Sequence, residues 1–170
     1  MAILPIFADQ LGMGPAGLGW LRAAPALGAI LMALYMTSQP PFERVGRTLL
    51  KVVTVFGVSI LAFALSRNFW LSMALLMMSG MADNISVIIR HSIIQAYTPD
   101  EMRGRVSAVN GIFIGSSNEL GAFESGFAAK LMGTVPSVIF GGTMTLVAVA
   151  LIAWKAPELR RLGAIHRPGT

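Results

Sequence analysis

The sequence contains no cysteine and few charged residues: 13 of its 170 residues are Lys or Arg, and eight are Asp or Glu. Without cysteine there is no disulfide framework, no thiolate metal site and no thiol catalysis. Charged residues make up 12% of the chain, about half of the roughly 25% that a soluble domain carries. Hydrophobic residues reach 55%, and the mean hydropathy is +0.69.

Charge is missing altogether from three long stretches. Residues 23–42, 52–66 and 131–154 contain no Asp, Glu, Lys or Arg. About 20 apolar residues in a helix cross the hydrocarbon layer of a bilayer, which is roughly 30 Å thick, at a rise of about 1.5 Å per residue. The composition therefore predicts an integral membrane protein with an all-α, polytopic bundle of transmembrane helices.

The apolar segments and the polar linkers between them predict five full spans, a bundle that covers residues 15–155. The expected spans are residues 15–37, 48–66, 69–96, 101–129 and 136–154. We expect residues 1–14 to be the end of an earlier span with an outer loop, and residues 156–170 to be a cytoplasmic tail. The N-terminus lacks the basic region of a signal peptide and begins within an apolar run, so we expect upstream sequence to be missing.

The basic residues are distributed unevenly between the two ends of these spans. Arg67 and Lys130 belong to one side, and nine basic residues belong to the other: Arg44, Arg47, Lys51, Arg103, Arg105, Lys155, Arg160, Arg161 and Arg167. Cytoplasmic loops carry the excess of Lys and Arg, which predicts a cytoplasmic C-terminus. Nucleic-acid binding would require basic residues matched to aromatic residues on one face, and the sequence shows no such pattern.

The charged run that begins at Thr98 predicts the start of a helix at the cytoplasmic side. Thr98, Pro99 and Glu101 fit a capping box, with Thr at the N-cap, Pro at the first helical position and Glu at the third. Asp100 and Glu101 would face the positive end of the helix dipole.

Ionisable side chains within the expected spans are candidates for function, because each costs about 2.5 to 3.5 kcal/mol at the centre of a membrane helix. Arg22 and Glu119 lie at similar depths, roughly 10 Å and 8 Å from the outer edge, so we predict that they pair. Asp83, with Asn84 beside it, is either a substrate or proton site or a satisfied interhelical contact. The candidates for a substrate or proton pathway are Asp83, Asn84, Glu119, Arg22 and Asn118.

Other polar and small residues carry weaker signals. Arg90 can extend to the inner interface, His91 is expected at the same interface, and Glu124 is expected to face water near the outer one. Gly111 and Gly115 form a GxxxG pattern, and Gly17, Gly19 and Gly28 also predict close helix packing. The 11 Met residues favour core filling over a promiscuous cavity.

Three stretches of the sequence resemble a known family. "ERVGR", residues 43–47, resembles the signature loop of the major facilitator superfamily, with Glu43 where Asp is usual and a tight turn expected at Gly46. Residues 4–29 and 98–129 are similar to bacterial facilitators of the enterobactin-exporter type, although Ala122 stands at an acidic position of that group. The resemblance implies helices eight to twelve and the end of seven. It also implies conformational-switch loops that contain Glu43, Arg44, Gly46, Arg47, Asp100, Arg103 and Arg105.

The resemblance implies a transporter fragment rather than an enzyme. The expected activity is proton-coupled efflux of a small hydrophobic or siderophore-like compound across the bacterial inner membrane, together with a missing N-terminal half. Its partners would be lipid, that half and the substrate, without nucleic acid, metal or cofactor. The alternative is a self-assembling small membrane protein that acts as an accessory subunit or channel. The sequence offers no His-rich metal set, no nucleophile with a base and no phosphate-binding loop, and we expect little transport by the isolated chain.

Overall fold

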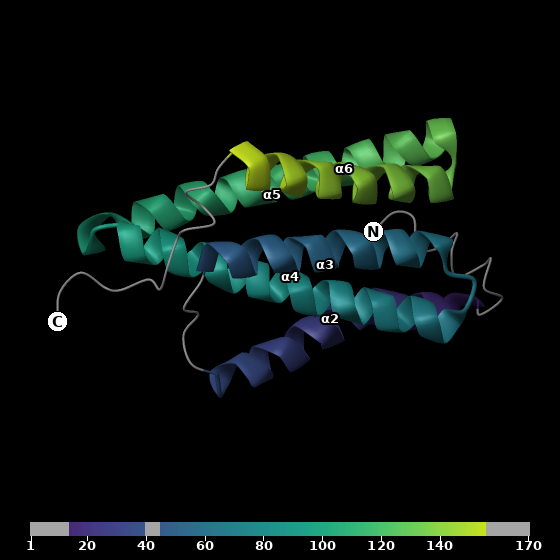
Figure 1. The fold of residues 1–170 in the computed structure, drawn as a ribbon, viewed down its shortest axis with the longest axis horizontal. Coiled ribbons are helices and arrows are strands. Elements are labelled where there is room, and N and C mark those ends of the chain that lie inside the picture. The colour runs from purple at the N-terminus through teal and green to yellow at the C-terminus, as the bar shows by residue number, and fades with distance from the viewer. Residues whose placement is uncertain (1–13, 40–44, 156–170) are drawn as a thin grey trace.

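The predicted apolar segments form helices. The computed structural model describes residues 14–39 and 45–155, which form a helical bundle (Figure 1). The elements are α2 (Gly14–Thr37), α3 (Val45–Leu65), α4 (Phe69–Tyr97), the short 3-10 helix η1 (Asp100–Met102), α5 (Arg103–Met132) and α6 (Thr134–Lys155). This confirms the all-α prediction. The expected end of an earlier span and the expected tail after residue 155 lie outside the described residues.

Four of the five described α-helices have both the length and the composition of a membrane span: α2, α3, α4 and α6. The exception is α5, which has 30 residues but too little apolar character to meet the same criterion. Its sequence includes Asn110, Asn118, Glu119 and Glu124. α5 is long enough to cross a bilayer. Polar side chains are costly in lipid, so in a membrane we expect those of α5 to face protein or water.

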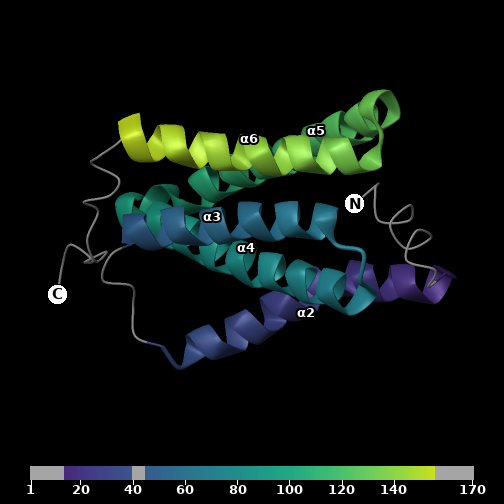
Figure 2. The same cartoon turned by 45° about the vertical axis from the view of Figure 1, so that its right-hand side comes forward.

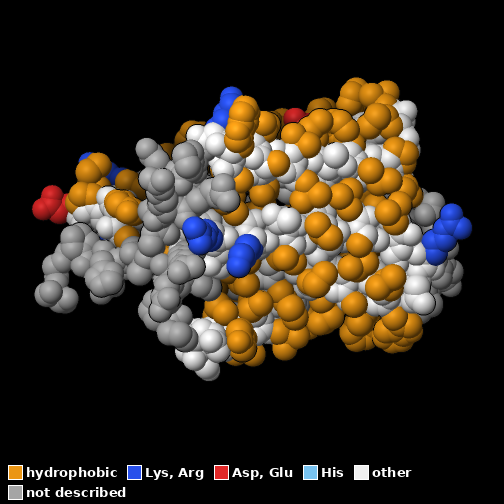
Figure 3. All heavy atoms as spheres, viewed as in Figure 1, with side chains coloured by type: hydrophobic (Ala, Val, Ile, Leu, Met, Phe, Trp, Pro, Cys, Tyr) orange, Lys and Arg blue, Asp and Glu red, His pale blue; other side chains and the backbone are white. Residues whose placement is uncertain are grey.

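The helices form layers around a central pair. α3 and α4 pack against each other, α2 packs on α4, and α6 packs on α3 and carries α5 (Figures 1 and 2). The chain reverses direction at each connection, so the start of α3, the η1 turn and the end of α6 lie at one end of the bundle. Figure 3 shows a surface that is mainly apolar, with Lys and Arg side chains toward the ends.

Two reciprocal pairs of glycines bring the helix backbones close together. A Cβ on Gly28 of α2 would collide with the backbone of Met77, and a Cβ on Gly80 of α4 would collide with the backbone of Pro25. At the α3–α6 contact, a Cβ on Gly57 would meet Leu146 at 2.9 Å and one on Gly142 would meet Leu61 at 2.8 Å. Close backbone approach is how helices pack where lipid removes the hydrophobic force between them.

The prediction of close packing was therefore right for Gly28 and wrong for three other glycines. Gly28 makes the expected close approach, whereas Gly19 has open space where its Cβ would be. Gly111 and Gly115 of the GxxxG pattern also have nothing within 4 Å of an added Cβ. The reason is that α5 does not lay this face against another described helix.

Small polar residues complete the packing of α4. Ser72, Ser79 and Ser86 are buried and recur every seven residues, hence on one helix face. Ser79 Oγ donates to the Leu76 carbonyl at 2.7 Å, and Ser72 Oγ bonds to Ser66 Oγ at 3.0 Å. A serine that bonds locally leaves no unpaired hydroxyl at a helix contact while keeping the side chain small.

The helix ends follow local chemistry, but not the predicted capping box. Asn68 caps α4, because its Oδ1 accepts from the Trp70 and Leu71 amides at 3.0 and 3.4 Å. Gly133 ends α5 at a φ of 85°, which glycine adopts without steric strain. Thr98 does not cap the following helix: its Oγ1 donates back to the Ile94 carbonyl at 2.6 Å, so Thr98 instead ends α4.

Candidate functional site

The middle and end of α4 carry the main group of polar side chains within the spans. Arg90 Nη2 lies 4.0 Å from Asp83 Oδ1, two helical turns away, and Arg90 Nε donates to the Ser86 carbonyl at 3.3 Å. The Asp83 and Arg90 side chains are 60% and 48% exposed. α4 therefore provides its own counter-charge, which lowers the cost of placing two ionised groups in a membrane segment.

Asn84 stands beside Asp83 with an unpaired acceptor. Its Oδ1 is buried and has no hydrogen-bond partner, as is also the case for Ser137 Oγ. A buried polar atom without a partner costs about 1 to 3 kcal/mol. Such an atom is a candidate contact for a ligand or a water molecule.

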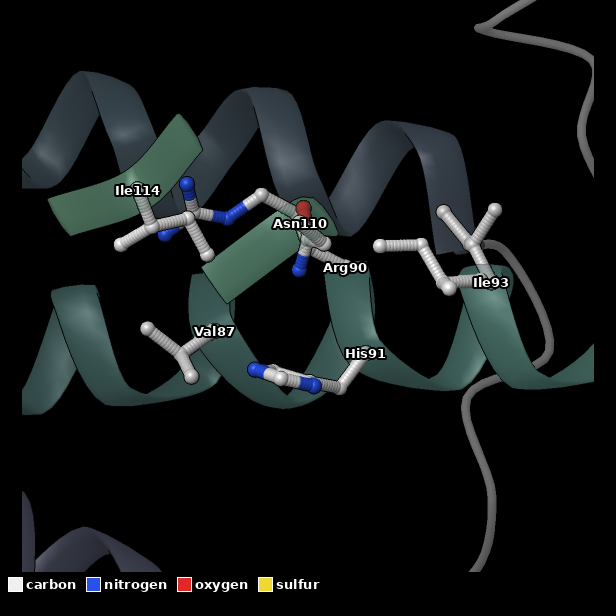
Figure 4. A pocket seen from close by; sticks show the side chains of 7 residues that line it. Val87, Arg90, His91, Ile93, Asn110 and Ile114 are labelled. Carbon is white, nitrogen blue, oxygen red and sulfur yellow. The ribbon is translucent and has the colours of Figure 1, made fainter. Parts of the chain in front are cut away.

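A cavity of about 330 Å³ lies between α4 and α5. The polar residues that line it are Arg90, His91 and Asn110, and the apolar ones are Val87, Ile93, Ile94 and Ile114. Figure 4 shows the Arg90 side chain extending from α4 toward α5, where Asn110 and Ile114 lie. A mostly apolar wall with a few converging polar groups is the usual form of a small-molecule site.

Asn118 and Glu119, two of the predicted pathway residues, lie on α5 and are exposed. No residue of α5 is buried, and neither side chain forms an ion pair or side-chain hydrogen bond within the described part of the chain. One face of α5 is nevertheless polar. Ser107, Asn110 and Ser117 follow one another at spacings of three and seven residues, and Asn118 and Ser125 lie seven residues apart on the adjoining part of the same face.

The predicted pair between Arg22 and Glu119 is wrong. Within residues 14–39 and 45–155 the ion pairs are Asp83–Arg90 and Asp100–Arg103, and Arg22 is exposed on α2. Equal depth in the membrane did not make the two residues neighbours, because α2 packs on α4 whereas α5 packs on α6.

The expected switch loops are described only in part. Glu43 and Arg44 lie outside the described residues. Gly46 is buried in the first turn of α3 and has no positive φ, so the tight turn expected at Gly46 is wrong. Arg47 follows it in the same turn.

At the other loop, Arg103 Nη1 contacts Asp100 Oδ1 at 2.7 Å. This short pair joins η1 to the first residue of α5. Arg105, two residues further along, is exposed and forms no ion pair among the described residues.

The sequence did not predict that Arg90 and Asn110 line the same cavity. The seven-residue spacing of Asp83 and Arg90 was a readable signal for a pair on one helix face. Asn110 carried no such signal, because its place beside Arg90 depends on how α5 meets α4. No group of three or more His, Asp or Glu residues in the described ranges is arranged to hold a metal ion.

Comparison with known proteins gives a family match and several similar transporters. The sequence model of the Major Facilitator Superfamily matches residues 1–168. The 4-hydroxybenzoate transporter PcaK of Pseudomonas aeruginosa is 27% identical over 99% of this chain and 38% of its own length. The enterobactin exporter EntS is 29% identical in Escherichia coli O1:K1, over 94% of this chain, and 28% identical in Shigella flexneri, over 95%.

The chain spans 38–39% of the length of these relatives. No solved structure matches it significantly.

Proposed function

Since the chain belongs to the Major Facilitator Superfamily, we propose that it forms one part of a secondary transporter that exports a small hydrophobic or siderophore-like compound in exchange for protons. The observation that carries the proposal is the family match over residues 1–168, joined to relatives that are named as transporters of small molecules. The proposed location is the bacterial inner membrane, with the C-terminus in the cytoplasm.

The proposal includes a second polypeptide segment that supplies the rest of the transporter. Secondary transporters of this type bind substrate near the bilayer midplane, between two halves that rock against each other. A chain that spans 38% of its relatives has one such half at most. The polar face of α5, of which Ser107, Ser117 and Asn118 are exposed, supports this idea, since polar groups in a membrane helix normally face a bundle interior or a water-filled cavity.

Within that scheme, Asp83 and Asn84 are the proposed substrate or proton residues of α4, and Asn118 and Glu119 those of α5. Arg22 is retained as a candidate without its predicted partner. Asp100 and Arg103 would hold the η1 turn together in one conformational state through their 2.7 Å contact.

Transport should require both parts. We would express the chain alone, the open reading frame encoded directly upstream of it, and the two together. Inverted membrane vesicles would then be assayed for substrate uptake driven by a proton gradient, with 4-hydroxybenzoate and enterobactin as probes. We expect transport only with both parts, and we expect the Asp83→Asn variant to lose its response to the proton gradient while membrane insertion is unchanged.

Transport by the isolated 170 residues would contradict the two-part proposal. Native mass spectrometry of the purified chain tests the alternative: a defined oligomer would favour a self-assembling accessory subunit or channel. Since the chain has no cysteine, single cysteines at positions 103 and 67 can also report the orientation. We expect position 103 to be labelled from the cytoplasm and position 67 from outside.

A further inference from the structure

We propose that the α4–α5 cavity binds a small organic carboxylate, with Arg90 as its anion contact and Asp83 as the internal carboxylate that the ligand displaces. This inference rests on the proposed transport function, for which it names the substrate class. It concerns a site that this chain builds on its own, before any other part of the transporter is added.

The first argument is the unused hydrogen-bonding capacity of Arg90. A guanidinium carries five N–H donors, and one of them, on Nε, is bonded to the Ser86 carbonyl at 3.3 Å. The Nη2–Asp83 separation of 4.0 Å is too long for a hydrogen bond. In the described part of the chain the Nη groups therefore have a nearby opposite charge but no hydrogen-bond acceptor.

The second argument is what surrounds that guanidinium. The cavity wall combines Arg90, His91 and the Asn110 amide with the apolar side chains of Val87 and Ile114 (Figure 4). A cation would be repelled by Arg90, and a fully hydrated inorganic anion would gain nothing from the Val and Ile side chains. A carboxylate on a compact apolar body matches both parts of the wall.

The size of the cavity sets the size of the ligand. Its volume of about 330 Å³ is at the low end of the roughly 300 to 1,000 Å³ that small-molecule sites occupy. A monocyclic acid such as benzoate fits this space. The cavity lies toward the end of α4 that leads into η1, which is the proposed cytoplasmic end.

The third argument is the length of the internal pair. A carboxylate that binds a guanidinium directly makes two parallel bonds of about 2.7 to 2.9 Å, much shorter than the 4.0 Å of Asp83–Arg90. A ligand carboxylate can therefore replace a long contact with a short, bidentate one. In the empty site, Asp83 compensates the charge of Arg90. In the occupied site, the ligand takes over that role.

The test is isothermal titration calorimetry on the full 170-residue chain in lipid nanodiscs, with benzoate, benzyl alcohol and acetate as probes. We expect saturable binding of benzoate, and binding at least about tenfold weaker for benzyl alcohol, which lacks the charge, and for acetate, which lacks the apolar body. Arg90→Gln should weaken benzoate binding at least about tenfold, and Arg90→Lys should have an intermediate effect. Asp83→Asn should strengthen it several-fold, because the competing carboxylate is gone.

The control is Arg67→Gln, which removes an exposed arginine from the α3–α4 turn and should leave benzoate binding unchanged. Circular dichroism checks that each variant keeps its helices, and the gain expected from Asp83→Asn cannot result from misfolding. Equal affinity for benzoate and benzyl alcohol, or unchanged benzoate affinity in Arg90→Gln, would overturn the proposal.

Two outcomes separate this proposal from the transport proposal. If the two-part vesicle assay shows transport that Arg90→Gln leaves unchanged, the anion site is refuted and the transporter stands. If the chain binds benzoate with the expected dependence on Arg90 but the two parts together transport nothing, the site is supported and the transport proposal fails.

Discussion

α4 and α5 are successive α-helices of similar length, with 29 and 30 residues, yet they differ in how much of their surface is buried in the bundle. α4 packs against both α2 and α3 and has seven buried residues. α5 has none and leaves Phe113, Phe123 and Phe127 more than half exposed. α4 is a core helix of the described bundle, whereas α5 has faces that remain open to other partners.

Residue size explains much of the contrast. The buried positions of α4 are mainly Ser, Gly and Ala, with Leu76 and Ile89 the only larger ones, so neighbouring backbones can approach closely. α5 contains more glycines than α4, but an added Cβ on Gly111, Gly115 or Gly121 would meet nothing within 4 Å. Small residues thus mark a helix contact only where a second helix offers a complementary surface.

The largest expected difference in stability between α4 and α5 comes from replacing one glycine by alanine in each helix. Gly80→Ala should destabilise the bundle by about 3 kcal/mol, since the new Cβ would collide with the Pro25 backbone, which cannot rotate away. Gly115→Ala should be neutral or stabilising by up to about 1 kcal/mol, because Ala favours the helix and nothing lies nearby. Unfolding by increasing mole fraction of SDS, followed by circular dichroism, measures both. Equal losses of stability in Gly80→Ala and Gly115→Ala would contradict the difference in packing between α4 and α5.

A smaller difference is expected from matched leucines. Leu76 is 5% exposed on α4, and Leu120 is 60% exposed on α5. Leu76→Ala should destabilise the bundle by about 2 kcal/mol through the cavity that it leaves. Leu120→Ala should change stability little, since lipid or detergent fills the space. The same SDS titration checks this pair, and a larger loss at Leu120 would show that α5 is covered by another copy of the chain.

The sequence predicted the helices well because the signal is local. Each observed helix begins and ends within three residues of its predicted span, since runs of apolar residues and the breaks between them lie along the chain itself. Composition also indicated the sidedness of the basic residues, and Arg47, Arg103 and Lys155 do lie toward one end of the bundle.

The candidate site was less predictable, because it depends on which helices are neighbours. Depth along the membrane normal placed Arg22 and Glu119 together, but depth carries no information on lateral position. The cavity between α4 and α5 depends on Arg90 of α4 and Asn110 of α5 lining the same space, which no spacing in the sequence encodes. The hydroxyl of Thr98 had two possible partners, and it bonds to Ile94 behind it rather than to an amide ahead.

The ion pair within α4 should have a modest effect on stability. Asp83→Asn, Arg90→Gln and the double variant form a cycle that isolates the energy of the pair. We expect a coupling of about 0.5 to 1 kcal/mol, since both side chains are about half exposed and 4.0 Å apart. The SDS titration provides the four stabilities. A coupling indistinguishable from zero would mean that Asp83 does not hold Arg90 in the empty site.

The smallest effect is expected for Arg22 and Glu119, which have equal depth but lie on separate helices. Neither forms an ion pair in the described structure, so Arg22→Glu and Glu119→Arg should be additive to within about 0.5 kcal/mol. The charge-swapped double variant should then be no more stable than the sum of the two single changes predicts. A rescue of more than about 1 kcal/mol would show that α5 can reach α2, which would place the polar face of α5 inside the bundle. Measured alongside the α4 cycle under the same conditions, this comparison separates a counter-charge within one helix from a contact between two.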